Sequence, residues 1–397
     1  MDYSRMAEQE KDYIIEKRRF FHGAPELSWQ EYKTTGAIAA ELARLGYQVR
    51  TFGDKTGVVA ELTGGAAGEG CKTVVLRADI DALPVEEKTG LAYASCNEGV
   101  MHACGHDCHI AMLLGAARLL AETKSELCGR VRLLFQSAEE TCGGAEYYME
   151  KGVLDGADAI FGMHIWGTLD APLFSIERGA RMASCDNFTI TVKGLSAHAT
   201  APHLGIDAIV AASAIVMNLQ SFVSRNNDPL NPVVLTVGEF NAGQRFNIIA
   251  SKAVLKGTAR TFDHEFRKKI KSGVENIAKM TAAAYGASAE VEYEMLPPAV
   301  VNDDEDLINL ACDAVADMYG ESAFGSLQPM LGSEDFAFYM EKIPALYCFV
   351  GGRNERLGIT ATNHNDCFTV DEAALPRGSA LYARFASDFL KGGRSNN

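Results

Sequence analysis

The chain has 397 residues, of which 47% are hydrophobic and 22% are charged, a composition typical of a globular protein. Single hydrophobic cores stop growing at about 250–300 residues, so we expect two domains. The formal net charge of −15 argues against a nucleic acid or an anionic membrane as a partner, because both are bound through clustered Lys and Arg. A small-molecule partner fits this charge better.

The N-terminal segment, MDYSRMAEQEKD, lacks the apolar core of a signal peptide. No run approaches the ~18 consecutive apolar residues of a membrane span. We therefore expect a cytoplasmic location. The ten cysteines are scattered along the chain, a pattern that favours reduced thiols, most of them in the core.

The first part of the chain alternates helices and strands. Residues 16–46 predict two helices interrupted at Gly23–Pro25. A further helical pattern covers 110–123. Short apolar runs predict strands at 58–62, 72–79, 130–137 and 159–165. This alternation predicts an α/β domain with a mixed sheet and helices on both faces.

Between residues 186 and 297 the predicted order becomes strand, helix, strand, strand, helix, strand. This is the ferredoxin-like βαββαβ plan, an α+β arrangement. The six elements are expected at 188–194, 206–225, 233–240, 256–262, 265–284 and 289–296. The α/β pattern then returns, with a helix near 306–318, a strand at 345–350 and a helix at 374–390. We therefore expect residues 1–185 and 298–397 to form one larger domain, into which residues 186–297 are inserted.

Four segments carry side chains that bind transition metals. They are MHACGHDCH (101–109), LLFQSAEET (133–141), GMHIWG (162–167) and HNDCFTVDE (364–372). Each one alone is as typical of a core cysteine, a solvated turn or a satisfied core histidine. Together they supply thiolate, imidazole and carboxylate groups suited to a metal such as zinc. The five candidate ligands are Cys104, His106, Glu140, His164 and His364.

The chain resembles the aminoacylase and carboxypeptidase type of metallohydrolase. Its branch contains hippurate hydrolases, N-acyl-amino acid amidohydrolases and auxin-conjugate (indoleacetyl-amino acid) hydrolases. The resemblance covers nearly the whole chain. It runs, in order, through RRFFHGAPELSWQE, LRADIDALPVEE, MHACGHDCH, FQSAEE, GMHIWG, GLSAHATAPHLGIDAI, RFNIIA, GTARTF, GSEDFAFY and HNDCFTVDEAALPRG. It implies a metal-dependent amidohydrolase whose larger domain is catalytic and whose inserted domain is a lid and dimerisation domain, in a homodimer.

The resemblance also implies roles for the candidate ligands. The five residues would hold two divalent ions, Zn²⁺ or Mn²⁺, and Glu139 would be the general base. Five protein ligands leave positions on two four-coordinate ions that a bridging thiolate and a bridging water would fill. Cys104 is our candidate for that bridge.

Further residues take roles from the same resemblance. His198 matches a histidine that reaches the active site of the other subunit and stabilises the oxyanion, although a surface histidine is the simpler interpretation of this residue alone. Asn247 and Arg260 match positions that contact substrate, and an Arg fork suits a free carboxylate. The structural alternatives are a turn Asn and an Arg on a strand surface.

Three aspartates match groups that orient the metal ligands. They are Asp79, Asp81 and Asp107. A turn at a strand end is the alternative for the first two. The chain departs from the family pattern where Cys108 replaces Gly, and with Cys367 this adds two thiols near the metal segments. These thiols leave the metal identity and the sensitivity to oxidation open.

Three other functions compete with an N-acyl amino acid amidohydrolase. A dipeptidase or carboxypeptidase would share the metals and differ in the acyl pocket. A hydrolase with Cys104 as nucleophile would need no metal. A silent metal-binding protein would have no reason to keep Glu139.

Overall fold

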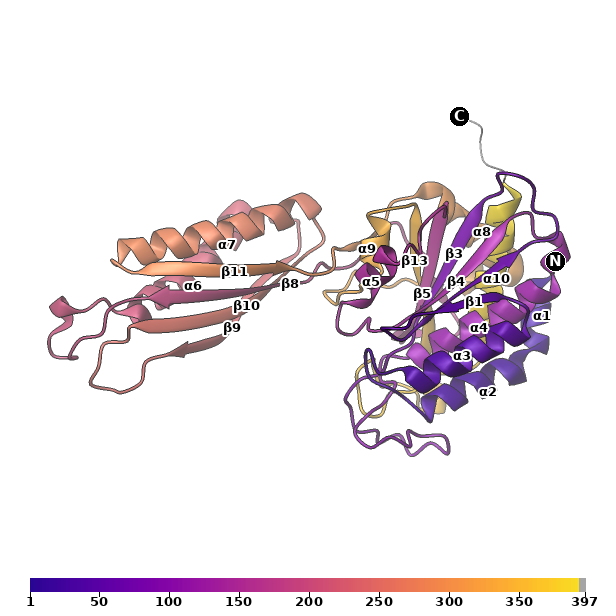
Figure 1. Ribbon diagram of the computed structural model, residues 1–397, viewed down its shortest axis with the longest axis horizontal. Coiled ribbons are helices and arrows are strands. Elements are labelled where there is room, and N and C mark those ends of the chain that lie inside the picture. The colour runs from indigo at the N-terminus through magenta and orange to yellow at the C-terminus, as the bar shows by residue number, and fades with distance from the viewer. Residues whose placement is uncertain (393–397) are drawn as a thin grey trace. The chain divides into compact units, whose positions relative to one another are not determined.

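A computed structural model describes residues 1–392, and these form two compact units (Figure 1). The smaller unit contains Ala180–Val301 together with Pro329–Ala337. The larger unit contains the rest of the described chain. The sequence-based bounds, 186–297, differ from this division mainly at 329–337. That segment joins the smaller unit because Met330 accepts a hydrogen bond from the Ala183 N–H (3.0 Å) and donates one to the Arg181 carbonyl (3.0 Å).

The larger unit contains a seven-stranded mixed sheet in the order β1-β2-β4-β3-β5-β13-β6. The four central strands, β4, β3, β5 and β13, are parallel, and the outer strands run antiparallel to their neighbours. Every residue of β3 is buried, which explains its continuous apolar run. The strands are β1 (Gln48–Thr51), β2 (Val58–Thr63), β3 (Thr73–Asp79), β4 (Arg130–Gln136), β5 (Ala159–Asp170), β6 (Phe174–Ser175) and β13 (Ala345–Arg353).

Helices of the larger unit pack with alternate strand residues into one core. α4 is the most deeply buried of them, and it packs on α2, α10 and β3. The α-helices are α1 (Tyr3–Gln9), α2 (Lys11–His22), α3 (Tyr32–Arg44), α4 (His106–Glu122), α5 (Gly144–Glu150), α8 (Glu305–Tyr319), α9 (Ala337–Met340) and α10 (Ala374–Lys391). Within residues 1–392, single 3-10 turns cover Lys124–Glu126, Glu321–Ala323 and Glu355–Leu357 in the larger unit and Pro202–Leu204 in the smaller unit.

The smaller unit is a four-stranded antiparallel sheet in the order β11-β8-β10-β9. Two helices pack on it and share its core (Figure 1). The elements are β8 (Asp186–Lys193), α6 (Ala208–Asn226), β9 (Val233–Ala242), β10 (Lys252–Thr261), α7 (His264–Ala284) and β11 (Ser288–Met295). β7 (Gly179–Met182) and β12 (Val300–Asn302) form a separate two-stranded sheet. The predicted α/β fold with an inserted ferredoxin-like domain is confirmed.

Within the described chain, α6 alone has the length and hydropathy that a membrane span would need. Its Ala211, Ile215 and Leu219 side chains pack into the core of the smaller unit. Core helices of globular proteins pass the same test, so α6 is weak evidence for a membrane segment.

Candidate metal centre

The candidate ligands of the larger unit gather at the carboxyl ends of the parallel strands, which is where α/β proteins place their sites. Asp79 is the last residue of β3, and Glu139 and Glu140 follow the end of β4. His164 lies in the neighbouring strand β5. His106 begins α4 at this same edge of the sheet. Segments far apart in the sequence therefore converge.

The Cys104 thiol lies at the centre of the cluster. Its Sγ atom is 3.4 Å from His164 Nε2 and 3.3 Å from His364 Nε2. Glu140 Oε1 lies 3.7 Å from His364 Nε2 and 3.8 Å from His106 Nε2. The structure thus brings all five predicted ligands together, and groups of three among them could each hold one ion.

Two atoms of the cluster fit a metal ion better than they fit a metal-free protein. His106 Nε2 and Glu140 Oε1 are both buried, and neither has a hydrogen-bond partner among residues 1–392. Buried polar atoms are normally paired, because an unpaired one costs about 1–3 kcal/mol. A divalent cation would satisfy both, and the imidazole, thiolate and carboxylate groups around it are donor types that bind transition metals.

The electrostatics of the cluster also call for positive charge. Burial, followed by the charges of Glu140 and Glu139, raises the pKa of the Cys104 thiol well above its ordinary value. Burial raises the pKa of Glu140 to about 7. Burial would lower the pKa of His106, but Asp79 and Asp81 outweigh it and raise this pKa to about 10. A bound cation would reverse these shifts, because it favours the deprotonated ligands.

Unusual backbone conformations place the ligands. Gly105 has φ 91° just before α4 begins, and a Cβ there would lie 2.4 Å from the Ile165 side chain. Ala138 (φ 58°) and His364 (φ 69°) also adopt the left-handed region, which is uncommon for residues other than glycine. The His364 N–H donates to the Ala103 carbonyl at 2.7 Å. This bond holds the late histidine against the segment that carries Cys104.

Asp81 contacts a candidate ligand directly. Its Oδ1 atom lies 3.2 Å from His106 Nδ1. Its Oδ2 atom accepts hydrogen bonds from the Ser28 hydroxyl (2.7 Å) and the Glu140 backbone N–H (3.1 Å). A carboxylate that binds one ring nitrogen of a histidine leaves the other nitrogen available for a metal. The orienting role of Asp81 stays a prediction, and this contact is the geometry on which it depends.

Asp107 does not follow the same expectation. Its carboxylate binds Arg18 Nε (2.8 Å) and His22 Nδ1 (2.8 Å), both on α2. The reason is helical geometry, because neighbouring residues of an α-helix point about 100° apart. His106 therefore faces the ligand cluster while Asp107 faces α2. The prediction that Asp107 contacts a ligand needs this correction.

Glu139 lies beside the ligands. One of its carboxylate oxygens is within 4.8 Å of donor atoms of both His106 and Glu140. The Glu139 residue is 7% exposed, so some water can reach it. A carboxylate near a cation site in this way can accept and deliver a proton.

His109 is a buried residue of the cluster that sequence analysis did not single out. Its ring stacks on His106 at 5.3 Å and meets His164 edge to face at 4.5 Å. Both of its nitrogens are engaged, because Nδ1 contacts Asp79 and Nε2 accepts the Ile165 N–H at 2.8 Å. His109 is therefore unsuited to be a ligand. The signal that could have found it is its spacing three residues after His106, which places both on one helix face.

The predicted substrate residues all lie in the smaller unit. His198 is exposed, and its Nδ1 accepts the Thr200 N–H at 3.2 Å. A neutral imidazole with this bond carries its proton on Nε2. Asn247 Oδ1 and Arg260 Nη1 are buried and lack hydrogen-bond partners within the described part of the chain. Such atoms are available to a ligand.

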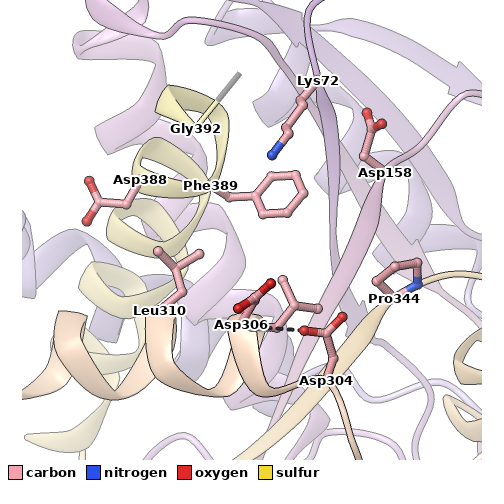
Figure 2. A pocket seen from close by; sticks show the side chains of 10 residues that line it. Lys72, Asp158, Asp304, Asp306, Leu310, Pro344, Asp388, Phe389 and Gly392 are labelled. Atoms are coloured by element: carbon pink, nitrogen blue, oxygen red, sulfur yellow. Dashed lines mark hydrogen bonds between the residues drawn. The ribbon is translucent and has the colours of Figure 1, made fainter. Parts of the chain in front are cut away.

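A separate cavity of about 730 Å³ lies at the opposite ends of the strands (Figure 2). Its lining includes Lys72, Asp158 and Pro344, which immediately precede β3, β5 and β13. Figure 2 shows Lys72 beside the Phe389 ring, with its Nζ 4.7 Å from the ring centroid. The cavity holds none of the predicted site residues.

A cluster of thiol, imidazole and carboxylate donors on an α/β sheet, with an inserted ferredoxin-like domain, defines a metal-dependent hydrolase. The chain belongs to the peptidase family M20/M25/M40, which matches residues 75–388. It is a metal-dependent enzyme that hydrolyses amide bonds, as predicted.

Individual relatives agree with this assignment. The N-acetyl-L-cysteine deacetylase of Bacillus subtilis (strain 168) is 42% identical over 377 residues, covering 95% of this chain and 88% of that protein. Thermostable carboxypeptidase 1 of Saccharolobus solfataricus is 39% identical over 383 residues, covering 96% of each. The crystal structure of a dinuclear metal binding peptidase from Bacillus subtilis, also of the M20 family, matches with a TM-score of 0.85 at 37% identity, covering 97% of this chain and 99% of that one. The predicted pair of divalent ions agrees with that structure.

Proposed function

We propose that the protein cleaves the amide bond of an N-acyl amino acid at a centre of two Zn²⁺ or Mn²⁺ ions. The observation that carries the proposal is the position of Cys104 Sγ, 3.4 Å from His164 Nε2 and 3.3 Å from His364 Nε2. The unpaired His106 Nε2 and Glu140 Oε1 atoms support it. Cys104, His106, Glu140, His164 and His364 would hold the two ions, and Cys104 belongs to more than one of the groups of three donors among them.

Glu139 is the general base of the proposed reaction. Two divalent ions would supply Lewis acidity for the scissile carbonyl and lower the pKa of the attacking water. Glu139 takes the proton from that water and delivers it to the leaving nitrogen, which a carboxylate beside the ligands can do without being one. Asp81 holds the His106 ring in place through the 3.2 Å contact with its Nδ1.

The smaller unit supplies substrate contacts in this proposal. His198, from the partner subunit, donates a hydrogen bond from Nε2 to the developing oxyanion. Asn247 and Arg260 bind the carboxylate of the amino acid, for which an Arg fork is well shaped. Support comes from the proton position that the Thr200 contact sets on His198 and from the unpaired atoms of Asn247 and Arg260.

A homodimer follows from the same proposal, with the smaller unit as the contact surface. β9 is an edge strand of the four-stranded sheet, and α6 packs over β9 and β10 beside that edge. Ile209, Val210 and Met217 are exposed on α6. A second copy of the chain would cover both the apolar side chains and the strand edge, which are otherwise a risk for aggregation. We place this dimer in the cytoplasm.

A carboxypeptidase or dipeptidase remains the second candidate function, because the Saccharolobus solfataricus relative carries the former name. Both candidates use the same metals, and only substrates separate them. The test is a panel of N-acetyl, N-benzoyl and indoleacetyl amino acids together with dipeptides. Faster hydrolysis of dipeptides than of every N-acyl amino acid would favour the second candidate.

Chelation tests the metal centre itself. Protein stripped by a chelator should lose activity and regain it with Zn²⁺ or Mn²⁺, and Cys104→Ser should bind less metal. Cys108→Ser is the matched control, since Cys108 is a buried thiol four residues away that belongs to no candidate ligand group. Activity that survives chelation would reject the proposal. A nucleophilic Cys104 is disfavoured because its surroundings raise the pKa of the thiol.

A further inference from the structure

The backbone N–H groups on either side of His164 in β5 donate to side chains instead of to a neighbouring strand. β3 and β5 pair in parallel only from Val74–Ala159 to Arg77–Gly162. β5 continues beyond Gly162 and carries His164. β3 itself continues to Asp79 in its pairing with β4. Backbone N–H groups of β5 on the β3 side beyond Gly162 therefore need other partners, because buried N–H groups are almost always hydrogen bonded.

Two buried side chains supply hydrogen-bond partners where the pairing of β3 with β5 stops. The Met163 N–H donates to the Tyr382 hydroxyl at 3.1 Å, and that hydroxyl donates to the Arg77 carbonyl at 2.6 Å. The Ile165 N–H donates to His109 Nε2 at 2.8 Å. His164 lies between these two anchored residues. Its own Nδ1 contacts the Ile165 carbonyl at 2.7 Å, so Nε2 is the nitrogen that faces Cys104.

His109 is in turn fixed from behind. Because Nε2 accepts a hydrogen bond, the ring proton is on Nδ1, which donates to Asp79 Oδ1. The other oxygen of Asp79 accepts from Arg77 Nη1 at 2.6 Å. His109, Asp79 and Arg77 are all at most 1% exposed. The chain of contacts therefore links the end of β3 to the backbone of β5.

We propose that His109 is a positioning residue that holds the 164–165 peptide so that His164 Nε2 meets the metal next to Cys104. The inference rests on the proposed metal centre and deepens it. It also gives Asp79 a specific task, which is to fix the tautomer and orientation of His109, in addition to its charge lying 3.8 Å from His106 Nε2. Groups of this kind behind a ligand are worth about 10–100-fold in metal affinity.

Two substitutions separate the two contacts of His109. In His109→Gln, the longer amide can still accept the Ile165 N–H. In His109→Asn, the shorter amide can reach only Asp79. Ser379→Ala is the matched control, because it removes another buried hydrogen bond to α4, from the Ser379 hydroxyl to the Met112 carbonyl (2.9 Å). It should lower stability without affecting the metal centre.

The experiment is a Co²⁺ titration of the metal-free full chain, followed by absorbance, with the unfolding midpoint of each variant measured in parallel. We expect His109→Asn to bind Co²⁺ about 10–100-fold more weakly than the unsubstituted protein, and His109→Gln and Ser379→Ala to stay within about threefold. Equal affinity of the Asn variant and the unsubstituted protein would overturn the positioning role. So would a Gln variant that folds normally and yet binds as weakly as the Asn variant.

If His109→Asn does not fold, His109→Leu takes its place, because leucine has a similar volume and cannot accept the Ile165 N–H. Co²⁺ binding by a folded Leu variant about 10–100-fold weaker than by the Gln variant supports the role, and equal binding overturns it. Failure of the unsubstituted protein to bind Co²⁺ would instead reject the metal centre. The two proposals can therefore fail separately.

Discussion

Arg18 and Asp107 form an ion pair of 2.8 Å in which each side chain is only 1% exposed. Arg18 also donates to Glu372 Oε1 at 3.1 Å. Glu372 lies eight residues after His364 in the sequence. One buried guanidinium therefore ties the segment that carries Cys104 and His106 to the segment that carries the late histidine.

Arg18→Gln should lower the free energy of unfolding by about 3–5 kcal/mol, because it removes one partner of a buried ion pair and leaves the Asp107 carboxylate with the His22 contact alone. Arg19→Gln is the matched control, since Arg19 binds the same Glu372 but its side chain is 48% exposed. The control should change stability by less than about 0.5 kcal/mol. Chemical denaturation measures both, and equal effects of the two substitutions would contradict the importance of burial.

Glu139→Gln and Glu140→Gln should have different effects although the residues are adjacent. Glu139→Gln removes the base, so it should reduce turnover by about 10²–10⁴-fold and leave the metal content near that of the unsubstituted protein. Loss of the ligand should reduce the metal content first. Elemental analysis alongside an activity assay checks this, and a metal-depleted Glu139→Gln protein would show that the roles are misassigned.

His22 should make stability depend on pH. Burial acts to lower the pKa of His22, but its contacts with Asp107 and Glu87 raise it above the ordinary value. A raised pKa in the folded state contributes stability that is complete below about pH 6.5 and is lost as the pH rises through the folded pKa. The loss in unfolding free energy caused by His22→Gln should therefore be largest in mild acid and shrink toward alkaline pH. A difference that is constant over this range would contradict the charged contact.

Met217→Glu should convert the proposed dimer into a monomer, because it places a charge on the apolar surface of α6. Met280→Glu on α7 is the matched control, since the two methionines are 68% and 71% exposed. Analytical ultracentrifugation should show the change in mass for the first substitution alone. A protein that sediments as a monomer before any substitution would reject the dimer.

Most of the fold could be predicted because its patterns are local. The six elements of the smaller unit and the buried strand β3 follow from periodicity and apolar runs. The association of 329–337 with residues 181–183 could not be predicted, because it depends on backbone hydrogen bonds between distant segments. The ligand set was predicted from motifs whose order and spacing resemble a family. His109 and the orientation of Asp107 required the geometry of α4, in which each side chain faces a different neighbour.

Two of the five proposed ligands, Cys104 and His106, carry protons that a bound cation would displace. The raised pKa values of Cys104 and of His106, the latter to about 10, mean that both groups are protonated at neutral pH in the metal-free protein. If these residues are the ligands, metal binding must release these protons. Calorimetry in buffers of different ionisation enthalpy counts the protons released. A count of zero would contradict the proposed ligand set. Affinity for the ions would then rise with pH. At low pH, protonation of the ligand side chains would release the metal ions, and the enzyme would lose activity.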